Sequence, residues 1–429
     1  MRQWLNLLCL CFALSTLRTA APSRSKIAIT HITVIDVEAA TVRPEMTVLL
    51  EGNRITAIQP AENKESLPTK DIRMIDGRGM FLLPGLWDMH VHTDGEDRVL
   101  HLLLANGITG IRDMGGELAK LADARRRIDS GQLMAPRLIF AGPMLKGPSF
   151  AGDEWAWIIH SPEEGRQAVE RLAGLHVDFI KVHDGLTRED FLAIAAASKE
   201  KGIPFAGHVP ASIAPAEASD LGQRSIEHFE FVPKVCHVLF ESLAATRPRD
   251  LPSGCDPQSL DSLLRHFASN GTWLDPTVQS FRYFAPKQWN SIFSEFRELV
   301  PTIRRNHVLI LAGTDSSSFL EDRGDPPGIS LHNELAFFVD AGFTQAETLR
   351  AATLNPVIFL GLSESLGSIG VGKSANLVLL EGNPLRDISN TRRIAAVISE
   401  GRYLDRQMLD RMVRENCRNC SGGTQGTAH

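Results

Sequence analysis

The stretch LPGLWDMHVH at residues 83–92 decides the fold. It begins as an apolar, strand-like run and ends on polar side chains, which is typical of a buried strand that ends at a functional edge. Side chains alternate along a strand, so His90 and His92 share one face and both imidazoles can bind one cation. The chain has 14 histidines, and chance alone predicts about 0.4 such His-x-His pairs. The motif therefore needs support from elsewhere in the sequence.

Eight strand-like apolar runs alternate with helical segments along the middle of the chain. They lie at residues 81–86, 107–111, 137–141, 177–182, 203–207, 225–228, 272–274 and 308–312. Ser161 before a proline predicts one helix start, Thr187 predicts another, and Gly202 predicts a helix end. Eight strand–helix units predict an α/β fold, a closed (β/α)8 TIM barrel over residues 81–364.

Shorter strand patterns flank this region on both sides. Residues 26–80 and 365–405 alternate with period two, which predicts one small split β-sandwich domain built from both ends of the chain. The pattern slips at His31, as at a β-bulge, and residues 51–54 predict a tight hairpin turn. Residues 406–429 are interpreted as a C-terminal tail.

The N-terminus reads as a targeting segment. Residues 1–21 combine a positive start, an apolar run too short for a stable span and a small-residue ending, which predicts a signal peptide. We expect an exported protein, periplasmic or secreted, with no membrane attachment after cleavage; an uncleaved anchor is the alternative. Four cysteines then remain and permit disulfides in that compartment: Cys236, Cys255, Cys417 and Cys420.

Composition and charge narrow the class of partner. Hydrophobic residues make up 43% of the chain and charged residues 22%, with a net charge of -6. These values suit a globular enzyme and show no basic surface for nucleic acid. We therefore expect a small-molecule substrate, and the sequence leaves a homo-oligomer open.

Polar side chains also lie at, or just after, the ends of four of the later runs. They are Lys181, His208, His228 and Asp315. A single such histidine is more often a hydrogen-bonded core residue. Barrel chemistry, however, takes place at the C-terminal ends of the strands, and burying several imidazoles and a carboxylate there would be costly without a metal. Their joint placement predicts a metal site.

Lys181 ends an apolar run, where an ammonium would be poorly solvated. A plain structural role would pair it with Asp184 or Asp315. The functional interpretation is that burial lowers the pKa of the amine, which then takes up carbon dioxide to form a carbamate. A cationic lysine beside several imidazoles and a dication would be repelled, which favours the carbamate.

Residues 83–92 resemble the first barrel strand of the amidohydrolase superfamily. The ordered set His-x-His, Lys, His, His, Asp resembles its binuclear members with a carboxylated lysine, in the imidazolonepropionase-like and prolidase-like branch. Residues 367–380, with Asn383-Pro384 after them, resemble the family's return into its β-sandwich. The resemblance covers residues 26–405.

The resemblance implies a ligand set and a mechanism. His90, His92 and Asp315 would hold one divalent ion, His208 and His228 a second, and carboxylated Lys181 would bridge them. Zinc is the expected metal, although manganese, iron and cobalt suit the same ligands. A metal-bridging hydroxide would attack the scissile carbonyl, and Asp315 would carry the proton to the leaving nitrogen.

The substrate is less well defined. The resemblance favours cleavage of an amide or peptide bond in a dipeptide or N-acyl amino acid; a cyclic amide hydrolase, a deaminase or a non-catalytic scaffold are the alternatives. His332 and His183 are predicted substrate contacts. Val209-Pro210 after His208 departs from the dipeptidase pattern, which puts dipeptide specificity in doubt.

Overall fold

The computed structural model describes residues 25–63, 72–228, 257–324 and 326–418. The predicted signal peptide, Cys236, Cys255 and Cys420 lie outside these ranges, so those predictions stay untested. Within the described ranges, no helix is both long and apolar enough to cross a membrane.

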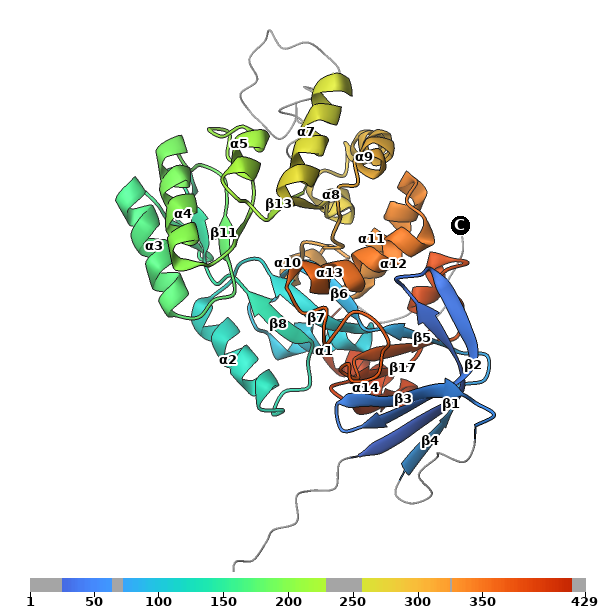
Figure 1. The fold of residues 1–429 in the computed structure, drawn as a ribbon. Helices are drawn as coiled ribbons and strands as arrows, with labels where there is room; N and C mark the ends of the chain where they lie inside the picture. The colour runs from blue at the N-terminus through green and yellow to red at the C-terminus, as the bar shows by residue number, and fades with distance from the viewer. Residues whose placement is uncertain (1–24, 64–71, 229–256, 325, 419–429) are drawn as a thin grey trace, which may run out of the picture.

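Strands from both ends of the chain share one sheet, in the order β18-β17-β16-β5-β1-β2-β3, with β4 beside β1 (Figure 1). β16 from the C-terminal part pairs antiparallel with β5 from the N-terminal part. The strands are β1 Lys26–Asp36, β2 Thr41–Glu51, β3 Arg54–Pro60, β4 Ile72–Asp76, β5 Phe81–Pro84, β16 Leu377–Leu380, β17 Ile394–Ser399 and β18 Arg402–Asp405. We call this the end sheet.

Two local predictions for the end sheet are confirmed. The register of β1 against β2 shifts on either side of Ile32, and His31 beside it has a φ of 54°, so the pattern slip is a bulge. β2 and β3 are joined by a two-residue turn, with Glu51 paired to Arg54 and Gly52 at a φ of 57°. Such a positive φ is what a tight hairpin requires. The division of the chain into domains remains a prediction.

The middle of the chain forms parallel strands that alternate with helices, an α/β arrangement. One sheet has the order β15-β6-β7-β8 and the other β10-β9-β11-β12-β13-β14. The strands are β6 Leu86–His92, β7 Ile108–Asp113, β8 Arg137–Phe140, β9 Met144–Lys146, β10 Ala156–Ile158, β11 Ile180–Val182, β12 Phe205–Gly207, β13 Ser225–Glu227, β14 Trp273–Asp275 and β15 Ser316–Ser317.

The closed ring of strands expected from the sequence is not seen as one continuous ladder in the described residues. Backbone hydrogen bonds outside the ladders join the two sheets instead, directly on one side and through the segment 309–312 on the other. Asp178 donates to the carbonyl of Phe140 over 3.0 Å, and Met89 donates to the carbonyl of Ala312 over 2.9 Å. Among the described residues, the predicted eighth strand at 308–312 forms no ladder and is linked to β14 by an isolated bridge between Leu274 and Ile310.

The first predicted strand, at 81–86, divides at Gly85. Residues before it form β5 in the end sheet, and residues after it form β6. A Cβ on Gly85 would lie 2.0 Å from Oγ1 of Thr109, so only glycine allows this close approach to β7. The apolar pattern ran through the division because both strands are buried.

Helices cover the parallel strands (Figure 1). Ser161 caps α3, Thr187 forms a capping box on α4, and Gly202 ends α4 at a φ of 67°, as the sequence predicted. The predicted tail begins with a helix, α14, and Cys417 after it is disulfide-bonded. The helices are α1 Asp97–Ala105, α2 Leu118–Asp129, α3 Pro162–Gly174, α4 Arg188–Lys201, α5 Pro215–Asp220, α7 Pro257–Asn270, α8 Phe281–Phe284, α9 Trp289–Arg305, α10 Ser318–Glu321, α11 Ile329–Ala341, α12 Gln345–Ala351, α13 Leu354–Phe359 and α14 Arg406–Asn416, with 3₁₀ turns η2 Pro148–Phe150, η3 Val278–Ser280 and η4 Ile388–Arg392.

Candidate metal centre

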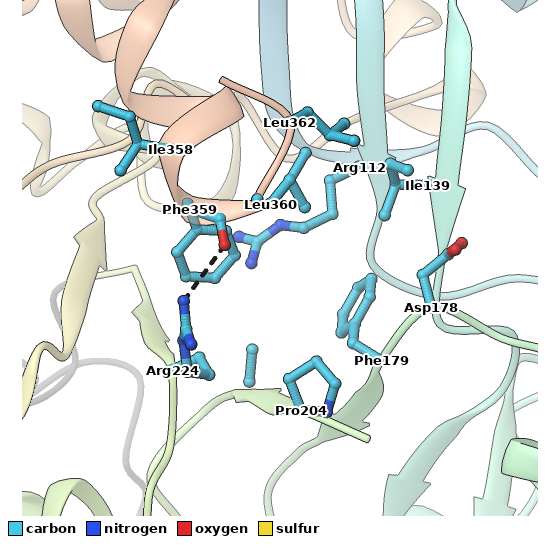
Figure 2. Close-up of a pocket in the computed structure, with 12 residues that line it drawn as sticks. Arg112, Ile139, Asp178, Phe179, Pro204, Arg224, Ile358, Phe359, Leu360 and Leu362 are labelled. Atoms are coloured by element: carbon cyan, nitrogen blue, oxygen red, sulfur yellow. Dashed lines mark hydrogen bonds between the residues drawn. The ribbon is translucent and has the colours of Figure 1, made fainter. Parts of the chain in front are cut away.

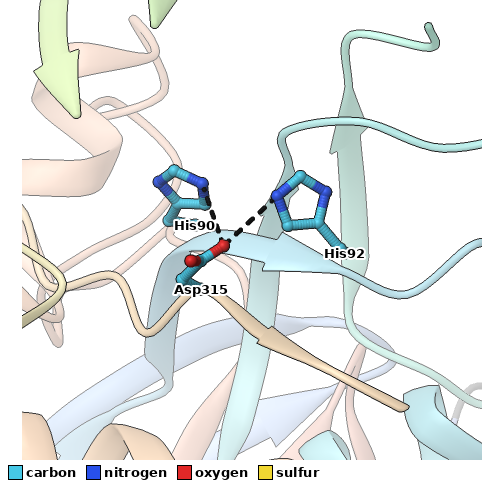
Figure 3. A group of neighbouring side chains, drawn as sticks. All are labelled: His90, His92 and Asp315. Atoms are coloured by element: carbon cyan, nitrogen blue, oxygen red, sulfur yellow. Dashed lines mark ion pairs between the residues drawn. The ribbon is translucent and has the colours of Figure 1, made fainter. Parts of the chain in front are cut away.

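His90 and His92 end β6 and face the carboxylate of Asp315 (Figure 3). Oδ1 of Asp315 lies 3.5 Å from Nε2 of His90 and 3.3 Å from Nε2 of His92. Asp315 has a φ of 57°, a left-handed conformation that costs energy for a residue with a side chain and is often found at functional sites. The alternation of β6 places both imidazoles on one face, as the sequence predicted, and the carboxylate of Asp315 lies on that face.

A row of imidazoles continues from His90 across the neighbouring strands. The ring centroids of His90 and His228 are 4.9 Å apart, and those of His228 and His208 are 4.8 Å apart. His183 stacks on His208 at 3.7 Å. The structure thus brings together four predicted histidine ligands and one of the two predicted substrate contacts at the C-terminal ends of β6, β11, β12 and β13.

Protein groups hold one nitrogen of each predicted ligand histidine. Nδ1 of His208 lies 3.1 Å from the carboxylate of Asp184. For the other three rings, Nδ1 bonds to a partner and Nε2 is the second nitrogen, an arrangement that orients metal-binding histidines. These partners are Glu227 for His90 at 3.0 Å, the Gly115 carbonyl for His92 at 2.8 Å, and Thr277 for His228 at 2.6 Å.

The surroundings of Nε2 of His90 indicate whether a metal ion fits between His90, His92 and Asp315. This atom is buried and has no hydrogen-bond partner among the described residues, although it points toward Asp315. A buried polar atom without a partner is costly, and a cation between the two groups would satisfy both. The atoms of His90, His92 and Asp315 that could bind an ion lie within 4.8 Å of one another. Imidazole and carboxylate ligands suit a divalent transition metal, so the residues present fit one.

Lys181, in β11, is 1% exposed and acts electrostatically on the whole histidine row. Burial, and then the Lys181 charge, lower the pKa of His90 and of His208. Burial also lowers the pKa of His92, but the hydrogen bond and charge of Asp315 outweigh it and raise that pKa overall. Lys181 therefore lies among the predicted ligands, inside the fold.

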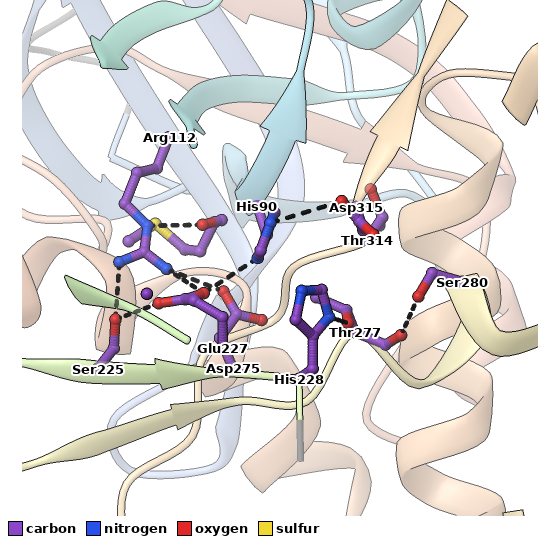
Figure 4. Close-up of polar contacts among 12 residues, drawn as sticks. His90, Arg112, Ser225, Glu227, His228, Asp275, Thr277, Ser280, Thr314 and Asp315 are labelled. Carbon is purple, nitrogen blue, oxygen red and sulfur yellow. Dashed lines mark hydrogen bonds and ion pairs between the residues drawn. The ribbon is translucent and has the colours of Figure 1, made fainter. Parts of the chain in front are cut away.

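A buried ionic network below His90 was not predicted (Figure 4). The guanidinium of Arg112 pairs with Glu227 at 2.8 Å and with Asp275 at 3.2 Å, and it also donates to Ser225. Arg112 is 1% exposed and both carboxylates are fully buried. Burial and the neighbouring Glu227 raise the pKa of Asp275 well above its usual range. A charged side chain inside the apolar run of β7 was the signal that could have revealed this network.

Asp88, two residues before His90 in β6, accepts a hydrogen bond from the His90 backbone at 3.3 Å. Its carboxylate also accepts from the backbone and hydroxyl of Thr314, at 3.1 and 2.8 Å. It therefore holds the end of β6 against the segment that carries Asp315.

His332 is a correction to the sequence prediction. It lies on α11 and is 3% exposed, with Nδ1 at 3.0 Å from the Thr391 hydroxyl and Nε2 at 3.1 Å from the Asn106 carbonyl. Both nitrogens are used inside the protein, between α11, η4 and the end of α1. The residue is a buried packing histidine and does not contact the histidine row as a substrate contact would.

His332 should make the protein acid-sensitive. Burial, and then the charge of Arg392, lower the pKa of His332 to about 3, whereas an unfolded histidine titrates near 6.5. Between these values the unfolded chain binds a proton that the folded chain excludes, so stability falls as pH drops below about 6.5. We expect about 2 kcal/mol less stability at pH 5 than at pH 7 from this residue. Urea unfolding at both pH values should show a smaller pH difference for His332→Gln than for wild type; equal differences would contradict the assignment.

A cavity of about 470 Å³ lies at the other end of the parallel strands (Figure 2). Phe179, Pro204 and Arg224, which line it, immediately precede or begin β11, β12 and β13. The histidine row stands where those strands end. The cavity and the predicted metal site are therefore at opposite ends of these strands, and the guanidinium of Arg112 lies between the two.

Comparison of this chain with known proteins identifies the family to which it belongs. Residues 81–404 match the model of the Amidohydrolase family. An adenine deaminase from Chelativorans sp. (strain BNC1) is 25% identical over 81% of this chain and 53% of its own length, so the chain spans about half of that relative. Ochratoxinase from Aspergillus niger is 25% identical over 79% of this chain and 78% of its own.

Solved structures agree on the fold. A putative prolidase from Bifidobacterium longum superimposes with a TM-score of 0.72 at 24% identity, over 92% of this chain and all of that one. A Xaa-Pro dipeptidase with bound methionine gives 0.71 at 23% identity, over 89% of this chain and all of that one. These likenesses indicate a TIM-barrel-like α/β fold. With a match over residues 81–404, the chain belongs to the amidohydrolase family.

Proposed function

We propose that this enzyme, which as an amidohydrolase acts on a carbon–nitrogen bond, hydrolyses the amide or peptide bond of a small substrate such as a dipeptide or N-acyl amino acid. One observation carries the proposal: a single oxygen of Asp315 faces Nε2 of both His90 and His92 at the strand ends, at 3.5 and 3.3 Å. The same carboxylate can help hold a cation and receive a proton.

The family generally binds divalent metals, and we propose two here, with zinc as the expected ion. His90, His92 and Asp315 would hold one, and His208 and His228 the other. A carbamate on Lys181 would serve both, since a buried cationic amine would repel the ions. Bound metals supply a nucleophile from water at neutral pH and polarise the scissile carbonyl.

The chain's own residues have separate tasks in this proposal. Asp315 takes a proton from the attacking water and delivers it to the leaving nitrogen. Glu227 and Thr277 keep the rings of His90 and His228 in place through their Nδ1 atoms. His183, 16% exposed at its side chain and stacked on His208, lies where it can contact substrate.

A substrate panel tests the reaction. Purified protein loaded with zinc is offered dipeptides, N-acyl amino acids, a cyclic amide and adenine, with release of free amine or ammonia as the readout. Hydrolysis of the linear amides supports the proposal. The similarity to adenine deaminase makes a deaminase the second candidate. Turnover of adenine or the cyclic amide alone would therefore reject hydrolysis of linear amides.

We also propose that the protein is exported, because residues 1–21 have the pattern of a signal peptide.

Metal analysis tests the bridging role of Lys181. We expect about two metal ions per wild-type chain and clearly fewer in Lys181→Ala, with most of the activity lost, because the shared ligand is missing. Lys199→Ala, on the outer helix α4, is the matched control and should keep both ions. Equal stoichiometry in wild type and Lys181→Ala would argue against the carbamate.

A further inference from the structure

Two half-buried aromatic rings lie beside the histidine row, and neither has a part in the chemistry above. The ring of Trp155 lies 5.8 Å from that of His92 and nearly parallel to it, at 10°. The ring of Phe150 meets His183 edge-on, with centroids 5.8 Å apart. Both are in the short segment that runs from β9 to β10. Trp155 therefore lies beside a predicted ligand of the first metal, and Phe150 lies beside the predicted substrate contact His183.

Two glycines allow this segment to lie against the site. A Cβ on Gly147 would fall 1.7 Å from the carbonyl oxygen of Gly185, and the Gly147 amide donates to the carbonyl of Asp184 at 3.0 Å. A Cβ on Gly185 would lie 2.7 Å from Ser149 Oγ and 3.1 Å from the Phe150 ring. The segment is therefore packed onto the loop that follows β11, and that loop carries His183.

An ion pair fixes the other half of the segment. Nζ of Lys146, a residue only 6% exposed, lies 2.6 Å from the carboxylate of Asp153. The other oxygen of Asp153 accepts from the Trp155 amide at 3.0 Å, and the Lys146 ammonium stands 5.1 Å from the Phe150 ring. Lys146 and Asp153 neutralise each other, so the exposed carboxylate of Glu154 is the remaining charge of this segment, and the rings of Phe150 and Trp155 are partly exposed beside it.

Half-exposed aromatic faces beside a polar centre are suited to bind flat apolar groups, because stacked rings attract each other beyond the effect of burial alone. We propose that Phe150 and Trp155 form an aromatic wall that binds a ring in the substrate, next to the bond that is cleaved. This rests on the proposed function and narrows its substrate class to amides with an aromatic side chain, such as a phenylalanine derivative.

The test compares N-acetyl-L-phenylalanine with N-acetyl-L-alanine. For the wild-type holoenzyme we expect the phenylalanine compound to be the better substrate in kcat/KM and the tighter ligand in calorimetric titration. In Trp155→Ala and Phe150→Ala the phenylalanine-to-alanine ratio of kcat/KM should fall about tenfold, mainly through KM. Trp155→Phe should restore most of it. Metal content should equal that of wild type, because neither ring is a ligand.

Trp157 provides a matched control. It lies two residues further along, and its ring stacks on Arg171 at 4.7 Å, away from the histidines. Trp157→Ala should keep the wild-type ratio. The proposal would be wrong if the phenylalanine-to-alanine ratio of kcat/KM stayed unchanged in both Trp155→Ala and Phe150→Ala. It would also be wrong if Trp157→Ala lowered that ratio as much as they do.

The two proposals can fail separately. If the enzyme hydrolyses both amides equally well, the proposed reaction stands and the proposed aromatic wall is rejected. If the protein binds the phenylalanine compound selectively but does not hydrolyse it, the aromatic wall stands and the proposed reaction is rejected. If the holoenzyme neither binds nor cleaves either compound, both are rejected.

Discussion

Replacing Asp315 with asparagine is expected to lower kcat by about 10²- to 10⁴-fold, the usual contribution of a positioned acid–base group. Burial alone would raise the pKa of this carboxyl, but the hydrogen bond from His92 and the charges of His228 and His92 bring the pKa below its usual range. Asparagine keeps the shape and a carbonyl oxygen but cannot accept and return a proton. The measurement is kcat and KM on the best linear amide from the panel, with metal content and melting temperature alongside.

Asp322→Asn is the control for this prediction. Asp322 is an exposed carboxylate shortly after Asp315 in the sequence, and its loss should leave kcat near the wild-type value. An Asp315→Asn variant that retains more than about a tenth of kcat with its metals in place would show that another group carries the proton.

Replacing Arg112 with methionine is expected to cost about 3–5 kcal/mol of stability, the typical result of breaking a buried ion pair from one side. Methionine fills much of the volume but leaves Glu227 and Asp275 fully buried without their cation. The midpoint of urea unfolding measures the loss. Combining Arg112→Met with Glu227→Gln and Asp275→Asn should recover a large part of it, since the neutral amides remove the uncompensated charges.

Arg126→Met serves as the control, because Arg126 is 67% exposed at its side chain and pairs with Asp123 on the surface of α2. Exposed pairs of this kind contribute about 0–1 kcal/mol. If Arg112→Met were as stable as Arg126→Met, the network would be held by contacts other than its charges.

The sequence predicted the features that depend on short-range patterns. Helix caps at Ser161 and Thr187, the bulge at His31 and the pairing of His90 with His92 all follow from local spacing and chemistry. The convergence of Lys181, His208 and Asp315 could also be predicted, because strand ends meet at one edge of parallel strands.

What could not be predicted depends on contacts between distant segments. Gly85 separates two sheets, yet the apolar run across it is continuous. His332 was predicted to contact substrate, but Asn106 and Thr391, which hold it in the interior, are remote in sequence. Phe150 and Trp155 gave no signal alone, because only the approach of Gly147 to Gly185 brings their segment onto the site.

The end sheet has a consequence for the order in which this protein can fold. β5 leads directly into β6 and the histidines, but its partner β16 is made only after the whole central part of the chain. Until then β5 is paired only with β1 and its other edge is open; long-range pairings of this kind are slow to form and prone to wrong association. The end sheet can therefore be completed only late in folding, and a chain cut short before β16 would expose the edge of the strand that leads into the predicted metal site.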